Sequence, residues 1–200
     1  VGRVRWVKAT GVGPNPAPFA EQPYEQRVAE AKRLVAEAGF GARRPLRFSL
    51  EILPGEAPRR VAVALQAMWR ALGAEVSIVN IGTKGHQKAL STGDFDLAWY
   101  TYFVPFSDAT AFLLLLESES NRNYSNYRNT EFDTMLSAAN DIVDPAERTA
   151  FLRQAEQLAL ADFPVFPLFT PMRVYLVSQR VRGWVNHTEP HLARHLSVID

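Results

Sequence analysis

The chain has 200 residues, 47% of them hydrophobic, which suits one large domain or one domain plus part of another with a sizeable core. Its 22 basic and 21 acidic residues nearly cancel, which argues against the clustered basic excess of a nucleic-acid-binding surface. Cysteine is absent, so disulfide scaffolds and thiolate metal sites are excluded.

The first half of the chain predicts strands and helices in alternation. The sequence starts abruptly at Val1 without a charged-then-apolar leader, so we expect it to begin inside a longer protein. An extended segment rich in glycine and proline comes first. Apolar spacing then predicts helices over 24–38, 59–72 and 84–90 and strands over 46–52, 74–81 and 94–101. The stripe predicted to face the core on the second helix is Val61, Ala64, Leu65, Met68 and Leu72.

Strand, helix, strand, helix, strand is the pattern of two crossover units, which predicts an α/β fold with a largely parallel sheet flanked by helices. The second half reads as mostly helical. Its helices are predicted over 108–116, 131–140 and 144–161, followed by an edge or irregular strand over 163–169 and a strand over 173–178. The third of these helices has a well-formed start, with Asp144 as N-cap, Pro145 at the first position and Glu147 at the third.

Catalytic and metal chemistry finds little support in the sequence. His187, His191 and His195 recur at helical spacing, but Pro190 interrupts that helix, so surface or interdomain histidines are favoured over a metal site. Asp94 and Asp96 share one side of a strand, and two exposed acids are favoured over an acid–base pair. No Gly-x-Ser-x-Gly elbow or dinucleotide fingerprint is present. We therefore expect no catalytic residues, no metal and no cofactor.

An aromatic run follows the third predicted strand, and a loop rich in Asn, Tyr and Arg follows further on. For Trp99 and Phe103, burial in the core is at least as good an explanation as ligand contact. The phenols of Tyr100 and Tyr102 need a wet or bonded edge, at the end of a parallel strand where open α/β sheets place ligands. The residues predicted to bind a ligand are Trp99, Tyr100, Tyr102, Phe103, Phe106, Asp108, Arg122 and Asn123.

The order of several short motifs points to a family. They include the helix at 24–40 ending Leu34-Val35-Ala36-Glu37-Ala38-Gly39-Phe40, the helix at 60–74, Gly93-Asp94-Phe95-Asp96, and the segments 124–133, 144–162 and 163–169. Together they resemble the C-terminal part of an ABC transporter solute-binding protein of extracellular family 5, which includes oligopeptide, dipeptide and nickel binders.

This resemblance implies a periplasmic or surface-anchored receptor with two lobes that close over a peptide-like solute. Residues 1–180 would form the second α/β lobe of a type II periplasmic-binding-protein fold. Residues 181–200 would return toward the first lobe, which is missing here. The implied partners are the ligand, the permease subunits of the transporter and that first lobe, with no nucleic acid.

One departure bears on the ligand. Peptide-binding members carry Trp-x-x-Asp-Tyr-x-Asp-Pro after this strand, and the first Asp pairs with the peptide's ammonium group. Here Pro105 stands in place of that Asp and Tyr102 in place of the Trp. The resemblance therefore implies a peptide held differently, a modified peptide, a sugar or another organic solute. Arg122 offers a fork for a carboxylate, or it is a solvated loop charge.

Two other functions are compatible with the residues. One is a small α/β hydrolase-like enzyme that uses Asp94, Asp96 or His86. The other is an interaction module in which the aromatic run docks a protein partner.

Overall fold

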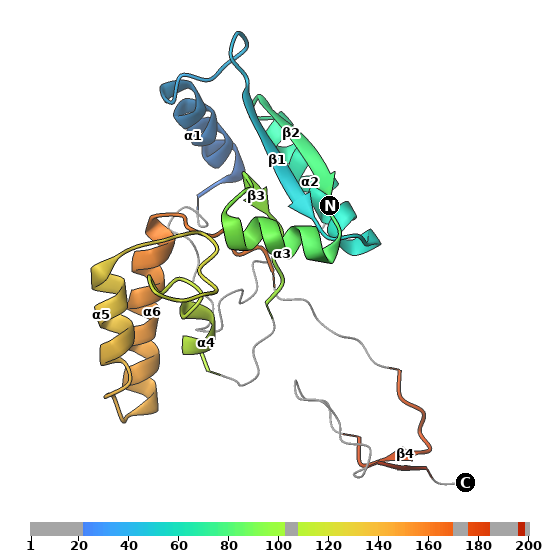
Figure 1. Cartoon of the computed structure of the whole chain (residues 1–200), viewed down its shortest axis with the longest axis vertical. Helices are drawn as coiled ribbons and strands as arrows, with labels where there is room; N and C mark the ends of the chain where they lie inside the picture. The colour runs from blue at the N-terminus through green and yellow to red at the C-terminus, as the bar shows by residue number, and fades with distance from the viewer. Residues whose placement is uncertain (1–21, 103–107, 170–175, 185–195, 199–200) are drawn as a thin grey trace. The chain divides into compact units, whose positions relative to one another are not determined.

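The computed structural model describes residues 22–102, 108–169, 176–184 and 196–198 (Figure 1). Backbone contacts divide the chain into a larger unit, residues 1–169, and a smaller unit, residues 170–200. In the smaller unit the described strands β4 (Val181–Arg182) and β5 (Ser197–Val198) pair antiparallel. The three C-terminal histidines, and residues 173–175 of the strand predicted over 173–178, lie outside the described residues, while residues 176–178 are described and form no strand.

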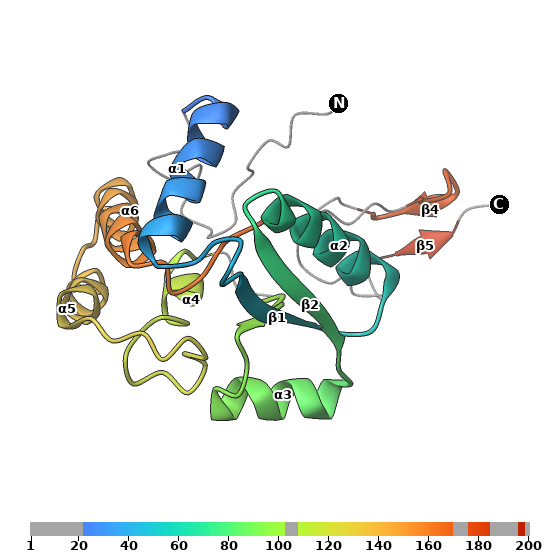
Figure 2. The same ribbon diagram turned by 90° about the horizontal axis from the view of Figure 1, so that it is seen from above.

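The larger unit contains a three-stranded parallel sheet. Its strands are β1 (Leu46–Ile52), β2 (Ala74–Asn80) and β3 (Leu97–Ala98), in the order β2-β1-β3, and both pairings are parallel. The crossovers contain α2 (Glu56–Arg70) and α3 (Thr83–Thr92), which lie on opposite faces of the sheet (Figure 2). The predicted α/β fold with parallel strands is therefore confirmed.

The third strand is shorter than the predicted 94–101. One carboxylate oxygen of Asp96 accepts hydrogen bonds from the backbone N–H and the hydroxyl of Ser49, both at 2.8 Å. A side chain therefore satisfies the backbone donor that a longer β3 would have paired. Regular pairing begins only at Leu97, which lies opposite Leu50.

The face of the sheet under α2 is apolar. Leu50, Ile52, Ala62, Ala74 and Val76 form its buried cluster, with Leu65 and Trp69 packed against it. The ring of Trp69 meets Phe48 edge to face at 5.2 Å. The stripe predicted for this helix was wrong at two positions, because Ala64 is exposed and Met68 is 55% exposed. Helix α2 is rotated so that Ala62, Leu65 and Trp69 contact the sheet, where the small Ala62 permits close approach.

A separate helical core follows the sheet. Helices α4 (Thr110–Leu113), α5 (Thr130–Ala138) and α6 (Pro145–Ala161) come after β3, and α5 packs against α6. The buried residues are Leu113, Leu116, Phe132, Leu136, Ala139, Leu152, Ala155 and Ala159. The predicted start of α6 is confirmed, since the Asp144 carboxylate accepts from the Glu147 backbone N–H at 2.7 Å.

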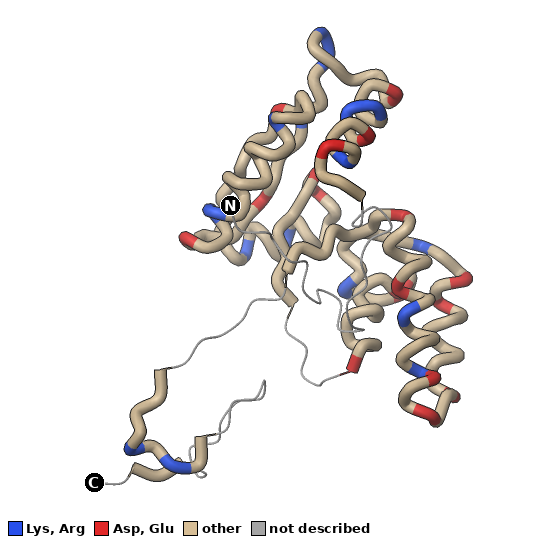
Figure 3. The backbone as a smooth tube through the Cα atoms, turned by 180° about the vertical axis from the view of Figure 1, so that it is seen from behind, with Lys and Arg blue, Asp and Glu red and all other residues tan. Residues whose placement is uncertain are grey.

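Helix α1 (Tyr24–Glu37) contains no buried residue, and Gly39 follows it at φ 81°, where a glycine is expected. Acidic and basic residues are interspersed along α1 and along the α5–α6 pair (Figure 3). The described residues from 163 to 169 form no regular strand, consistent with the irregular segment expected from Pro164 and Pro167.

Candidate functional site

The chain leaves the sheet at Trp99. Its backbone N–H donates to the Glu51 carbonyl at 2.8 Å, the last bond that ties this segment to β1. The half-buried ring packs against the sheet cluster and lies 5.8 Å from the ring of Phe169. The indole N–H donates to the Thr101 hydroxyl at 3.1 Å. Trp99 thus anchors the start of the segment that carries the following aromatic residues.

Tyr100 and Tyr102 form an aromatic wall with residues from two later segments. Their rings stack with centroids 6.2 Å apart. Tyr124 meets Tyr100 edge to face at 5.3 Å, and Phe112 of α4 meets Tyr102 in the same way at 6.0 Å. Tyr100 is 44% exposed, so the wall is open to solvent. Burial raises the pKa of the Tyr100 phenol, and the Tyr124 phenol beside it adds to the effect, so Tyr100 remains a neutral donor.

Arg122 joins this wall from the second loop, which connects α4 to α5. One terminal nitrogen of its guanidinium donates to the Tyr102 phenol oxygen at 2.9 Å. The guanidinium carbon lies 5.7 Å from the centroid of the same ring, within cation–π range. The side chain is exposed, and no described carboxylate forms an ion pair with it. The structure therefore brings together three of the predicted residues, Tyr100, Tyr102 and Arg122.

Asn123 shapes the loop that carries Arg122. Its amide nitrogen donates to the carbonyls of Glu117, at 3.1 Å, and Tyr127, at 2.7 Å. Its amide oxygen accepts from the Ser125 hydroxyl at 3.0 Å and the Tyr127 backbone N–H at 3.1 Å. These four bonds use the hydrogen-bonding capacity of one amide side chain.

Tyr127 anchors the same loop to the helical core. Its phenol donates to the Asp162 carboxylate at 2.8 Å, and its ring meets Phe132 edge to face at 5.9 Å. Burial, reinforced by the Asp162 hydrogen bond, raises the pKa of Tyr127 to about 12. The loop is therefore held at both its centre and its end.

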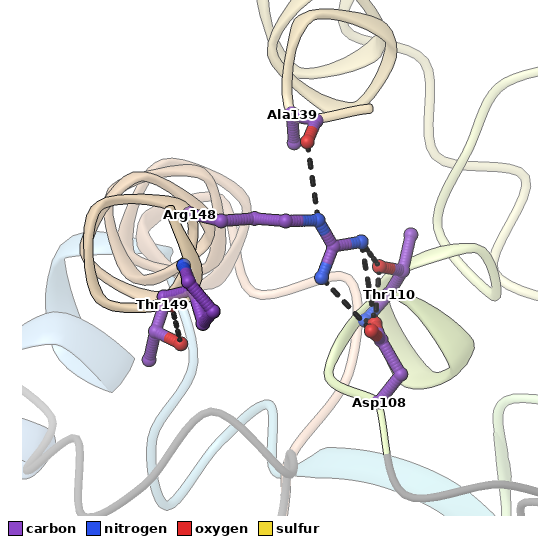
Figure 4. A network of polar contacts seen from close by, with 6 residues as sticks. Asp108, Thr110, Ala139, Arg148 and Thr149 are labelled. Carbon is purple, nitrogen blue, oxygen red and sulfur yellow. Dashed lines mark hydrogen bonds and ion pairs between the residues drawn. The ribbon is translucent and has the colours of Figure 1, made fainter. Parts of the chain in front are cut away.

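Asp108 belongs to a polar network in which Arg148 of α6 links the start of α4 to the end of α5 (Figure 4). Its carboxylate accepts from the Thr110 backbone N–H at 2.7 Å and from the Thr110 hydroxyl, and pairs with Arg148 of α6 at 2.8 Å. Arg148 also donates to the Thr110 hydroxyl at 2.6 Å and to the Ala139 carbonyl at 3.1 Å. Burial opposes ionisation of Asp108, but the bonds from Thr110 and Arg148 outweigh it, so its pKa lies below the ordinary value.

Phe103 and Phe106 lie in the segment 103–107, outside the described residues. Sequence reasoning did not select Phe112, Tyr124 or Arg148. Tyr124 could have been identified from the sequence, because it lies two residues from Arg122 in a loop rich in Asn and Tyr. Arg148 is 40 residues from Asp108, and nothing local in the sequence pairs them.

The residues considered for catalysis do not converge. The Asp96 carboxylate accepts hydrogen bonds from Ser49. The backbone N–H of Ser49 lowers the pKa of this carboxyl most, and the Ser49 hydroxyl lowers it further. His86 is 3% exposed, with Nδ1 3.9 Å from a carboxylate oxygen of Glu51. In the described part of the chain, no three His, Asp or Glu side chains are grouped to hold a metal ion. None of the helices among those residues combines the length and apolarity needed to cross a membrane.

The fold is that of the solute-binding proteins. The chain superposes on OppA of Burkholderia pseudomallei with a TM-score of 0.82 at 30% identity, covering 97% of this chain and 39% of that one. It belongs to the bacterial extracellular solute-binding proteins, family 5, whose middle region matches residues 6–124. The family suggested by the sequence motifs is thereby confirmed.

Two curated relatives from Escherichia coli are similar over most of the chain. The probable deoxycholate-binding periplasmic protein YgiS is 32% identical over 168 residues, which cover 84% of this chain and 31% of that protein. The periplasmic murein peptide-binding protein MppA is 28% identical over 181 residues, covering 90% and 34%. The chain thus spans about a third of the length of these relatives.

Proposed function

We propose that this chain is part of a receptor that captures a peptide-like or other organic solute outside the cytoplasmic membrane and delivers it to the permease subunits of an ABC importer. The observation that carries the proposal is the family match over residues 6–124, which includes both loops up to Tyr124. The names of YgiS and MppA place both relatives in the periplasm and assign them organic ligands, which supports a periplasmic or surface-anchored location.

In this proposal the ligand contacts the exposed side of the wall. Tyr100, Tyr102 and Arg122 provide rigid aromatic area and directional donors. Trp99 attaches the start of this segment to the sheet. Phe103 and Phe106 remain proposed contacts in the neighbouring segment. Asp108 and Asn123, also predicted as ligand-binding residues, act by holding the two loops in place.

The receptor binds its solute without transforming it. Asp96 is engaged with Ser49 and His86 is buried against Glu51, so neither is arranged for acid–base work on a solute at the wall. Affinity arises from hinge closure of two lobes, with residues 1–180 in one lobe and residues 181–200 returning toward the other. The 200-residue chain alone therefore binds its solute weakly.

The experiment that tests this function is mass spectrometry of small molecules released from the natively purified polypeptide that contains this chain. We expect one or a few solutes to be enriched and their masses to be unchanged after prolonged incubation with the protein. A Tyr100→Ala, Tyr102→Ala double variant, purified in parallel, should lose them. A solute that is consumed on incubation would indicate an enzyme instead.

A further inference from the structure

We infer that the solute is an organic anion, with a carboxylate bound by Arg122 and an apolar body lying on the wall of Tyr100, Tyr102 and Tyr124. The inference rests on the proposed function and specifies the chemistry of the ligand.

The charge that the site presents is positive. Asp108 is the single acid among the predicted site residues, and its charge is already balanced by Arg148 at 2.8 Å. An ammonium group would therefore have to displace an existing ion pair in order to bind there. Arg122, by contrast, forms no ion pair with any described carboxylate.

The acids of the second loop and of the start of α5 do not neutralise Arg122 either. The Glu119 carboxylate pairs with Arg128 at 3.1 Å. The Asp133 carboxylate accepts from the Ser118 backbone N–H at 3.0 Å. Glu117 lies in the same loop, and within the described residues no ion pair joins it to Arg122. The positive charge beside the wall is thus available to a ligand.

The guanidinium of Arg122 is held in a fixed position and has N–H donors that remain available to a ligand. One N–H is used by the Tyr102 phenol oxygen at 2.9 Å, and the group lies over the same ring. Its other donors have no hydrogen bond to described residues. A planar fork held in this way matches the two oxygens of a carboxylate, whereas it repels a cation and offers a neutral amide only single hydrogen bonds.

The surface beside this fork is aromatic and carries neutral phenols. Tyr100 stacks on Tyr102, and Tyr124 closes the edge of Tyr100. Because the pKa of Tyr100 is raised, its hydroxyl stays protonated and can donate a further bond to an anionic ligand. Such a wall accepts an apolar or aromatic ligand body over its ring faces and edges.

Three probes with one body and different charge test the inference. They are N-acetyl-Leu-Phe with a free carboxylate, the same dipeptide as a C-terminal amide, and Leu-Phe amide with a free ammonium group. Saturation-transfer NMR on the 200-residue chain at millimolar probe detects weak binding. We expect the anion to bind at least about tenfold more tightly than the other two, and the preference to shrink as salt is raised.

Variants in the second loop supply the matched comparison. Arg122→Gln should abolish the preference for the anion, whereas Arg128→Gln, which removes an arginine of the same loop that is paired with Glu119, should leave it intact. Equal binding of the three probes, or an unchanged preference in Arg122→Gln, overturns the inference and leaves solute binding standing. If no probe, no mixed peptide library and no bile acid binds either this chain or the longer native polypeptide, the proposed function itself fails.

Discussion

Replacing Arg148 by alanine should destabilise the larger unit far more than a typical arginine substitution. Arg148 joins three places that are distant in sequence: the start of α4 through Asp108 and Thr110, the end of α5 through Ala139, and its own helix α6. Its removal leaves the Asp108 carboxylate without its counter-charge and the Ala139 carbonyl without this donor.

The size of the effect follows from burial. The side chains of Arg148 and Asp108 are 24% and 35% exposed, so their pair is neither a surface contact nor fully desolvated. Breaking a fully buried pair costs about 3–5 kcal/mol and an exposed pair usually less than about 1 kcal/mol. We therefore expect Arg148→Ala to lower the free energy of unfolding by about 2–3 kcal/mol, measured by urea denaturation followed by tryptophan fluorescence.

Arg128→Ala is the matched control, because Arg128 pairs with Glu119 at the surface, with side chains 63% and 85% exposed. It should cost less than about 0.5 kcal/mol. A pH series adds a second readout. Since the folded-state pKa of Asp108 is depressed, its contribution is present above the unfolded pKa and is lost as pH falls through the folded value. In Arg148→Ala the free energy of unfolding should fall less steeply at acid pH than in the wild type. If Arg148→Ala were as stable as Arg128→Ala, the reasoning would be refuted.

Three further predictions concern the framework of the site. Phe132→Ala should destabilise the helical core by about 3–5 kcal/mol in urea denaturation, because the ring is fully buried beside Tyr127; a cost under about 1 kcal/mol would contradict the packing. Gly93→Ala should cost about 1–2 kcal/mol, since Gly93 ends α3 at φ 70°, and a stabilised variant would exclude that conformation. Asp96→Ala should lower the free energy of unfolding by about 1 kcal/mol and loosen β3, detected as faster amide exchange at Ser49. Because the pKa of Asp96 is lowered in the folded state, the stability difference between wild type and variant should disappear as pH falls through that pKa.

Most of the fold was readable from apolar spacing because each element buries a continuous stripe or an alternating face. The failures have local causes that spacing does not contain. The Asp96 side chain replaces a backbone bond and shortens β3, and the rotation of α2 follows from how closely Ala62 approaches the sheet. Predicting that rotation from the sequence would have required knowing the partner surface.

The candidate site was predicted in part for a similar reason. Tyr100 and Tyr102 follow a strand end, where parallel sheets place ligands, and Arg122 stands out in a polar loop. The ion pair of Asp108 with Arg148 joins residues 40 apart, so no local pattern assigned Asp108 a supporting role.

The contact between Arg122 and the Tyr102 ring exists before any solute arrives. An unrestrained arginine loses about 0.5–1.5 kcal/mol of rotamer entropy when a partner immobilises it. Here that loss occurs on folding, so the arginine is preorganised. Capture of a carboxylate should consequently proceed by rapid encounter with a rigid receptor surface, with little rearrangement at this side chain during association.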